Sequence, residues 1–282
     1  MPKLSRWQQS LYQFLLVLVG LFVLIPIWGL AEMAFDADIQ GWPLDFRIVP
    51  RLWSLDVFAN VWAHTTHDLS FLGLLRNSLI VSGGAALLSV AFGASMAYAF
   101  ARLRFPGQRA GLFALLFGTL LPPVALMTPL FILLSLLQVR TTLFGLIVVY
   151  TAFAMPFCVW NMRSAFQSVP RELEEAAFID GADFFGAFWR VTLPLALPSI
   201  AVAALVAFLA GYSEFAMAWL FIDNGENVTL AMSLAGMVGP TGASWNMIAA
   251  TAMLMCVPVV LIFVVFQKYL LSRFLLGGVE GE

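Results

Sequence analysis

The chain has 282 residues, of which 62% are hydrophobic and only 11% are charged, and its formal net charge is −2. A soluble domain ordinarily has about a quarter charged residues, so this composition excludes a soluble globular protein and predicts several membrane spans with no large soluble domain. The near-neutral charge also gives no sign of nucleic-acid binding, which favours a basic surface.

The first apolar segment predicts a transmembrane helix rather than a cleaved signal peptide. Lys3 and Arg6 precede it, as in a signal peptide, but Leu11 to Leu30 is a run of twenty residues without a charge. That length crosses the hydrocarbon core, and no clean cleavage pattern of small residues follows it. We therefore expect residues 1–10 to form a short terminal segment and the first span to be retained.

Hydropathy along the chain predicts six spans. The expected fold is an all-α integral membrane bundle covering residues 11–271, with an external loop at 35–71, a charged loop at 165–194 and a C-terminal tail at 272–282. The aspartates and prolines of the external loop are typical of turns, and its tryptophans suit either an interface or a small folded cap. The predicted spans are 11–34, 72–100, 110–137, 143–163, 196–222 and 246–271.

The distribution of lysine and arginine predicts that both termini are cytoplasmic. Cytoplasmic loops of membrane proteins carry an excess of these residues. With the N-terminus inside, ten of the fourteen lie on the cytoplasmic side and the charged loop is cytoplasmic as well. The ten are Lys3, Arg6, Arg102, Arg104, Arg109, Arg163, Arg171, Arg190, Lys268 and Arg273, and the other four are Arg47, Arg51, Arg76 and Arg140.

Prolines interrupt several of the predicted spans. Proline removes a backbone hydrogen bond and kinks a helix, so in lipid it requires neighbours or a cavity that satisfy the freed carbonyl. Any one kink is compatible with ordinary bundle packing, but together they are typical of a bundle that moves. Gly93 and Ala97 are spaced for close helix–helix packing. The prolines are Pro122, Pro123, Pro129, Pro156 and Pro258.

The sequence offers little catalytic or cofactor chemistry. A phosphate-binding P-loop needs a Gly-Lys pair, and neither lysine of the chain follows a glycine. His64 and His67 lie together on an external loop and are weak metal candidates. Cys158 and Cys256 lie in apolar stretches, where buried free thiols are expected rather than a disulfide. We therefore expect a protein that is not an enzyme and binds no metal or cofactor itself.

One acidic residue, Glu214, falls inside the fifth predicted span. An ionised group near the bilayer centre costs about 2.5–3.5 kcal/mol, so it should face a cavity or a partner. It could form a polar wall of a substrate passage, together with Tyr212, Ser213 and Met217, or it could lie close enough to the outer surface to reach water. The sequence favours neither alternative.

A charged and aromatic island at Glu174–Pro194 separates the fourth and fifth spans. Pro170 is expected to start a short helix whose first turns hold acidic residues, where the positive helix end favours them. Gly181 then permits a sharp turn, and Asp183 can cap a second short helix. The aromatic residues of that second helix are expected to form one face, and they are Phe184, Phe185, Phe188 and Trp189.

The charge of the island indicates a protein partner. Five acidic residues lie between positions 172 and 183, against Arg171 and Arg190. The alternative is an amphipathic helix that lies on the membrane surface. Such helices are usually basic, so this acidic island favours it less. Aromatic side chains flanked by charge are typical of anchors that enter a groove on another protein.

Three short elements of the island follow one another in a fixed order: Glu175-Ala176-Ala177, Asp180-Gly181-Ala182 and Leu193-Pro194. This pattern resembles the EAA motif of ABC-importer permease subunits, and the chain is most similar to the six-helix, maltose-type carbohydrate permeases. The resemblance covers nearly the whole chain. It also includes Arg102-x-Arg104-Phe105-x-Gly107, Pro129-Leu130-Phe131 and the ending Gly277-Gly278-Val279-Glu280-Gly281.

The resemblance implies one subunit of a complex in a bacterial or archaeal cytoplasmic (inner) membrane. The implied partners are a second homologous permease, two ATPase subunits that bind ATP and Mg²⁺, and an extracytoplasmic sugar-binding protein. The island would be the coupling helix that docks into the ATPase. The residues implied to couple are Glu174, Glu175, Ala176, Ala177, Asp180, Gly181, Phe184, Phe185, Phe188 and Trp189, and those implied for a tail contact are Gly277, Gly278 and Val279.

The resemblance also implies a carbohydrate substrate, contacted by Tyr212, Ser213, Glu214 and Met217. Disaccharides, longer oligosaccharides and glycosylated osmolytes are open, and a sugar phosphate is disfavoured because the interiors of the spans lack cationic groups. Two positions depart from similar permeases. Tyr212-Ser213 stands where they have Trp-Asn, which bears on the identity of the sugar, and Glu280 stands where they have a lysine, which bears on the electrostatics of the tail contact with the ATPase. A stand-alone secondary transporter and a membrane scaffold without a passage remain the alternatives from the residues alone.

Overall fold

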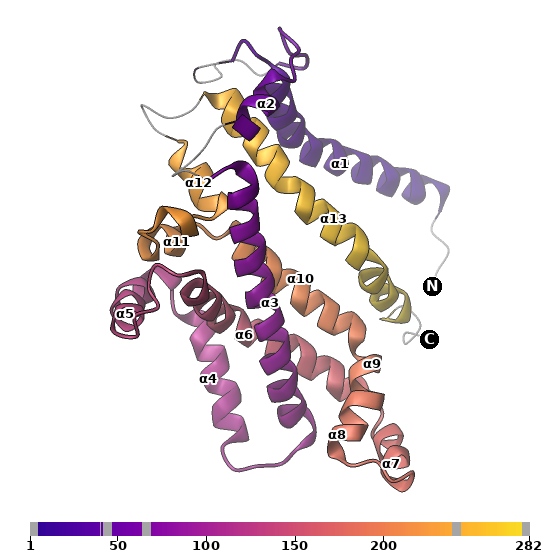
Figure 1. Ribbon diagram of the computed structural model, residues 1–282. Helices are drawn as coiled ribbons and strands as arrows, with labels where there is room; N and C mark the ends of the chain where they lie inside the picture. Colours follow the sequence, from indigo (N-terminus) through magenta and orange to yellow (C-terminus); the bar gives the residue numbers. More distant parts are fainter. Residues whose placement is uncertain (1–4, 40, 42–46, 64–68, 239–243, 278–282) are drawn as a thin grey trace. The chain divides into compact units, whose positions relative to one another are not determined.

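The described part of the protein is helical. This computed structural model describes residues 5–39, 41, 47–63, 69–238 and 244–277, with side chains as far as residue 268. These residues form helices joined by turns, with no strand among them apart from an isolated antiparallel bridge between Asp36 and Trp53 (Figure 1). The predicted all-α fold is confirmed.

The chain divides into two compact units. One contains residues 1–65 and 234–257, and the other contains residues 66–233 and 258–282. Two helices, α12 (Leu230–Gly236) and α13 (Trp245–Gly277), contribute residues to both. The second unit contains all predicted coupling and passage residues, so it carries the candidate functional site.

In the first unit, Asp36 organises the segment that follows α1 (Arg6–Phe35). Its buried carboxylate accepts hydrogen bonds from the backbone N–H groups of Arg51 (2.8 Å), Asp38 (3.0 Å) and Leu52 (3.2 Å). Burial alone would raise the pKa of Asp36, but these donors outweigh it, so its pKa lies below the ordinary value. The loop after α1 thus has fixed structure near its start.

The same loop contains a helix that the sequence did not predict, α2 (Asp56–Ala63). The ring of Phe35 lies 5.7 Å from that of Trp53 and 5.1 Å from that of Phe58. These aromatic contacts agree with the expected folded cap. The candidate metal ligands His64 and His67 lie outside the described residues.

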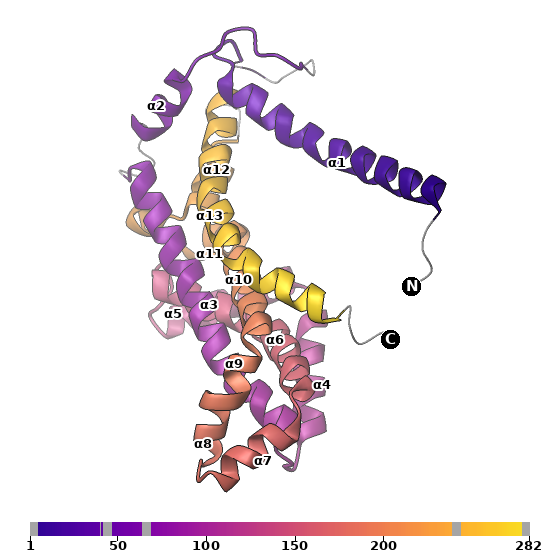
Figure 2. The same ribbon diagram turned by 90° about the vertical axis from the view of Figure 1, so that its right-hand side faces the viewer.

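The core of the second unit is built from α3 (Phe71–Arg102), α6 (Leu143–Ser168) and α10 (Leu197–Ser213), which lie side by side in Figures 1 and 2. Gly93 allows α3 and α6 to approach, since a Cβ atom there would lie 2.9 Å from Met162 Cε and 3.1 Å from Cys158 Cβ. The predicted close packing at Gly93 and Ala97 is confirmed, because both are buried. Cys158 is buried as expected, but Cys256, which was expected to be buried, is exposed.

Among the described residues, four helices are long and apolar enough to cross a membrane, and two bent helix pairs bring the number to six if each pair is one span. The four are α1, α3, α6 and the first 24 residues of α13. This agrees with the six predicted spans, but two of them are not continuous.

The third predicted span consists of α4 (Gln108–Leu120) and α5 (Pro123–Leu136), bent by 102°. Leu121 and Pro122 between them are extended, with ψ angles of 125° and 128°. The residue before a proline is biased away from the helical region, and neither Pro122 nor Pro123 has an N–H to continue the helix. The proline pair therefore breaks the span rather than kinking it.

The turn after α5 is held in an unusual backbone conformation. Thr141 has φ +63°, which is rare for a β-branched residue. Its N–H donates to the carbonyl of Phe221 (3.0 Å), and its Oγ1 accepts from the N–H groups of Asp223 (3.0 Å) and Asn224 (2.8 Å). Asn227, in the short helix η2 (Gly225–Asn227), donates through Nδ2 to the Thr141 carbonyl at 2.8 Å.

Residues on α3 hold the other side of this segment. Asn77 Nδ2 donates to the carbonyls of Glu226 (2.8 Å) and Val228 (2.9 Å), and Ser78 Oγ accepts from the N–H of Leu230 at 2.7 Å. We call residues 221–230, with Thr141, Asn77 and Ser78, the clasp. It joins three parts of the second unit that are far apart in sequence.

Candidate functional site

The island folds into two short helices joined by a tight turn, which we call the elbow (residues 170–196). Its first helix, α7 (Arg171–Ile179), begins after Pro170 and has Glu172 and Glu174 in its first turn, as predicted. Gly181 has φ +86°, a conformation that favours glycine. The N–H of Gly181 bonds to the carbonyl of Phe178 at 3.1 Å, which closes the helix end.

The second helix begins at the predicted cap. Asp183 accepts a hydrogen bond from the N–H of Gly186 at 2.7 Å, and α8 (Phe184–Ala187) follows directly. The chain continues through a π-helix, η1 (Phe188–Thr192), and α9 (Leu193–Leu195). It then bends by 77° into α10. Figures 1 and 2 show α7 and α8 at one end of the second unit, beyond α9.

The elbow presents an apolar surface away from the bundle. Phe184 is 65% exposed, Phe185 69% and Trp189 51%. The rings of Phe185 and Trp189 lie 5.8 Å apart, and Phe184 packs edge-on against Phe178 at 5.2 Å. Ile179, also exposed, extends this surface. Large exposed aromatic side chains held by helix caps are suited to docking into another protein.

The expected single face of four aromatic residues is not observed, because Phe188 points the other way. Its ring packs against Tyr98 at 4.8 Å and against Phe166 at 6.0 Å, so it is only partly exposed. Phe188 is the first residue of the π-helix η1, and its ring packs on α3 and α6 instead of continuing the exposed face of α8. Phe188 therefore anchors the elbow to α3 and α6.

Glu174 also faces the bundle and not the exposed surface. Its side chain is buried and forms an ion pair with Arg102, whose Nε lies 2.9 Å from Oε1. The hydroxyl of Thr192 donates to the same oxygen, and Arg102 Nη2 donates to the carbonyl of Val169 at 2.7 Å. This network joins the end of α3 to both ends of the elbow.

The remaining predicted coupling residues lie at or near the surface of the elbow. Glu175, Ala176 and Asp180 are exposed, and Ala177 is partly exposed. Their small or charged side chains flank the exposed aromatic residues. The structure therefore places an apolar surface beside acidic groups, as expected for a docking element.

Arg102 and Thr192 were missed as partners of the elbow. In the sequence, Arg102 stands out only as a cytoplasmic charge and as part of a loop pattern, and Thr192 carries no signal of its own. The sequence does contain a signal for an ion pair, since an arginine ends an apolar helix and an acidic residue lies in the first turn of the short helix of the island. The 72 positions between Arg102 and Glu174 hid this contact.

The fifth predicted span implied that Glu214 lies inside a helix, but it does not. That span breaks after α10, and Glu214 lies in the extended link before α11 (Ala216–Phe221). Its carboxylate accepts a hydrogen bond from the Tyr150 hydroxyl at 2.6 Å and from the N–H of Met217 at 3.0 Å. These donors supply the partner that a membrane carboxylate requires and let the helix break there.

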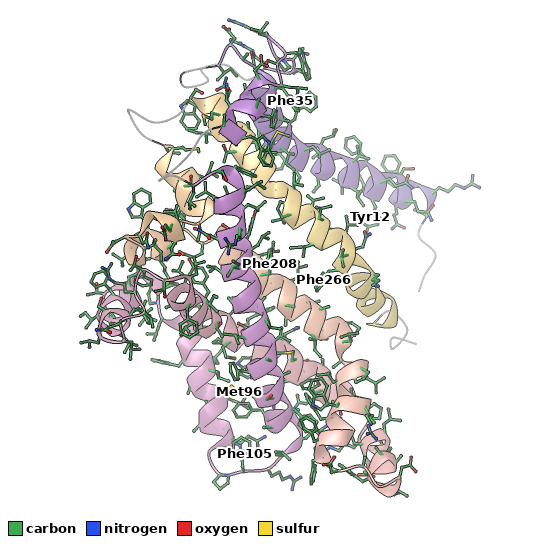
Figure 3. All side chains as sticks on the ribbon, viewed as in Figure 1. Tyr12, Phe35, Met96, Phe105, Phe208 and Phe266 are labelled. Carbon is green, nitrogen blue, oxygen red and sulfur yellow. The ribbon has the colours of Figure 1, made fainter. Side chains whose placement is uncertain are left out.

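The other passage candidates do not form one accessible surface. Tyr212 is buried and stacked on Phe208, with ring centroids 5.5 Å apart, and Figure 3 labels Phe208 on α10. Met217 is buried as well. Ser213 is exposed, and its hydroxyl donates to the carbonyl of Leu209 at 2.9 Å. A substrate role for these residues stays a prediction.

The tail contact is largely outside the structure. Gly277 is the last residue of α13, and Gly278 and Val279 lie outside the described residues. Within the described ranges, no group of three or more histidine, cysteine, aspartate or glutamate side chains is arranged to hold a metal ion.

Comparison with known proteins identifies relatives along nearly the whole chain. A trehalose/maltose transport system permease of Thermococcus litoralis is 30% identical over 94% of this chain and 95% of its own length. A maltodextrin transport system permease of Bacillus subtilis is 29% identical over 94% of each chain. A crystal structure of a bacterial ABC transporter involved in the import of the acidic polysaccharide alginate shares the fold, with a TM-score of 0.76, 22% identity and coverage of 96% of this chain and 100% of that one.

A family model also matches residues 89–275, and its description is "Binding-protein-dependent transport system inner membrane component". The match includes the elbow and most of the second unit. It confirms the resemblance inferred from the EAA motif and sets aside the stand-alone transporter and the scaffold. The chain therefore belongs to the family of binding-protein-dependent transport inner membrane components and is the multi-pass permease subunit, not the ATPase subunit, of an ABC importer.

Proposed function

We propose that this permease imports a carbohydrate across the cytoplasmic membrane. This proposal is supported by two relatives that match nearly the whole chain at about 30% identity, a trehalose/maltose and a maltodextrin transport permease. The fold alone does not select a sugar, because the solved structure that it resembles belongs to a transporter of an acidic polysaccharide. A neutral disaccharide or short oligosaccharide is the substrate class that best fits the relatives.

The complex would contain a second homologous permease, two ATPase subunits with ATP and Mg²⁺, and an extracytoplasmic sugar-binding protein. The elbow would dock into one ATPase subunit and pass its motion to the spans. The observation that supports this role is the exposed apolar surface of Phe184, Phe185 and Trp189. These residues directly follow the glycine turn and the cap of α8.

The orientation follows from the same docking. An ATPase that uses cellular ATP is cytoplasmic, so the elbow and the end of α3 would face the cytoplasm. Arg104, Arg171 and Arg190 lie there and are exposed, in agreement with the excess of positive charge on cytoplasmic segments. Both termini would then be cytoplasmic.

The docking role is tested by co-purification of the ATPase with Phe185→Ala and Trp189→Ala permeases from native membranes. Aromatic anchors at the centre of an interface contribute about 2 kcal/mol or more, so each variant should bind the ATPase about thirtyfold more weakly and, at a concentration near the wild-type dissociation constant, retain about fifteenfold less of it. Phe92→Ala is the matched control, because Phe92 is an exposed aromatic residue on α3 away from the elbow. Equal ATPase retention by all variants would contradict docking through the elbow.

The substrate class is tested by uptake into proteoliposomes that contain the complete importer and its binding protein. Labelled trehalose, maltose and maltotriose should be taken up in an ATP-dependent manner, and at least one should compete with the others. A labelled amino acid serves as the control solute. Uptake of the amino acid without uptake of any sugar would overturn the carbohydrate assignment and leave the permease assignment intact.

A further inference from the structure

The buried contacts between the elbow and α3 are more extensive than a docking element needs. Glu174 and Thr192 lie at opposite ends of the elbow, 18 positions apart, and Oε1 of Glu174 accepts hydrogen bonds both from the Thr192 hydroxyl and from Nε of Arg102, the last residue of α3. Thr192 is fully buried, and the side chains of Arg102 and Glu174 are 7% and 8% exposed. A buried ion pair holds its geometry only when further hydrogen bonds satisfy its remaining groups.

Those further hydrogen bonds are present. Arg102 also donates to the carbonyl of Val169, the residue that links α6 to the elbow. The last turn of α3 is held in addition by Gln108, whose Nε2 donates to the carbonyls of Phe100 at 2.9 Å and Leu103 at 3.2 Å. The end of α3 is therefore a fixed point to which the elbow is attached.

An aromatic seam reinforces the attachment. Tyr98 on α3, Phe166 on α6 and Phe188 in the elbow have mutual ring distances between 4.8 and 6.1 Å. Such contacts add packing energy and fix relative orientation. They lie one helical turn from Arg102, so the polar and apolar contacts act on the same part of α3.

The covalent path from the elbow to the next span is less direct. It runs through the π-helix η1 and α9, and then through the 77° bend before α10. π-Helical turns and bends are typical sites of local adjustment, so a displacement of the elbow would be absorbed there. The side-chain contacts with α3 have no such interruption.

We propose that the Arg102–Glu174–Thr192 network makes the elbow a rigid extension of α3, so that ATPase motion enters the spans through α3 and not along the backbone into α10. This inference rests on the proposed docking of the elbow to an ATPase. Arg102, Glu174 and Thr192 are positioning residues: they do not touch the ATPase, and they fix the docking surface to the helix that it moves.

The test uses the complete importer, in which sugar uptake and ATP hydrolysis are measured together. Glu174→Gln keeps the shape of the side chain but leaves Arg102 without its counter-charge. Loss of a charged hydrogen bond from the coupled state should lower sugar uptake by about tenfold or more, while bound ATPase and ATP hydrolysis remain. Glu172→Gln is the matched control, since Glu172 is an exposed carboxylate in the same turn of α7.

A second variant guards against misfolding. Replacement of both partners, Arg102→Met with Glu174→Met, leaves no unpaired charge and is expected to fold, because apolar pairs of similar volume replace buried ion pairs well. It should still retain the ATPase and show a raised ratio of ATP hydrolysed to sugar transported. A ratio equal to that of wild type in this variant and in Glu174→Gln would overturn the proposal.

A distance measurement gives a readout that a merely stabilising role would not change. Spin labels at Ser95→Cys on α3 and Glu172→Cys on α7, with the exposed Cys256 replaced by serine, report the position of the elbow on α3. In wild type the distance between the two labels should be the same with and without ATP. In Glu174→Gln the distribution of this distance should be broader. A wild-type distance that changes on ATP binding would refute rigid attachment, whereas failure of wild type to retain any ATPase would refute the docking itself.

Discussion

Asp36 shows how one buried carboxylate can order an irregular segment. The loop after α1 has few regular hydrogen bonds of its own, yet the N–H groups of Arg51, Leu52 and Asp38 converge on this side chain. Bonds to an ionised acceptor are stronger than neutral ones, so the charge of Asp36 contributes directly to the folding of this loop.

We predict that Asp36→Asn weakens this loop at neutral pH by about 2 kcal/mol, because three charge-assisted bonds become neutral or are lost. The pKa of Asp36 is lower in the folded state than in the unfolded state, so its contribution is present at neutral pH. It is lost as the pH falls below about 3.9 and through the still lower folded pKa.

Hydrogen exchange of the Arg51 and Leu52 amides, corrected for intrinsic rates, measures this effect. Protection in wild type should fall in acid toward that of the variant. Asp38→Asn is the control, since Asp38 is exposed and meets Arg51 only at 3.7 Å, a surface pair of little energetic value. If the protection of these amides in wild type did not change with pH, Asp36 would not be the group that orders the loop.

Glu174 and Glu175 show how far residue-level prediction extends. Both were expected to take part in coupling, and both lie on α7, but only the first is buried. Nothing in the local pattern separates two adjacent glutamates. The difference arises from Arg102, which α3 brings to one side of α7, and a contact across 72 positions is not encoded in local propensity.

At the scale of elements, the turn of the elbow followed local rules and was predicted well. A glycine at φ +86° ends α7 and an aspartate caps α8, as the residue types indicated. The breaks at Leu121–Pro122 and at Glu214 were not predicted as such. Proline signals a disturbance but not a 102° bend, and the break at Glu214 depends on a hydroxyl from α6.

We predict that Gly181→Ala loosens the elbow and reduces ATPase retention. No atom lies within 4 Å of the added methyl group, so the cost is that of the left-handed backbone, about 1–2 kcal/mol. Gly107→Ala is a closely matched control, because Gly107 has φ +84° and equally open surroundings outside the elbow. Both variants should lose similar stability, but only Gly181→Ala should lose bound ATPase in co-purification.

At the scale of the whole molecule, the second unit is held together by close approach of helix backbones. A Cβ atom on Gly84 would lie 2.9 Å from the side chain of Ile147, and one on Gly211 would lie 3.2 Å from that of Tyr150. In a membrane, where lipid competes for apolar side chains, such contacts between small residues are a principal source of helix association.

We predict that Gly93→Ala destabilises the second unit by about 1–3 kcal/mol, because the new methyl group overlaps the Cys158 Cβ, which cannot move without its helix. Gly118→Ala should be stabilising by up to about 1 kcal/mol, since Gly118 lies in α4 with no atom within 4 Å of the added carbon. Thermal unfolding in one detergent measures both. Equal effects at the two positions would show that backbone entropy, and not packing, governs the bundle.

The clasp sets an order of events during synthesis. Thr141 bonds with Asp223 and Asn224, which emerge from the ribosome 82 and 83 residues later. At a synthesis rate of about 5–20 residues per second, these partners are made roughly 4–17 s after the threonine. Until then these hydrogen bonds cannot compensate its left-handed backbone, so the turn after α5 reaches its final shape only when the chain returns from α10.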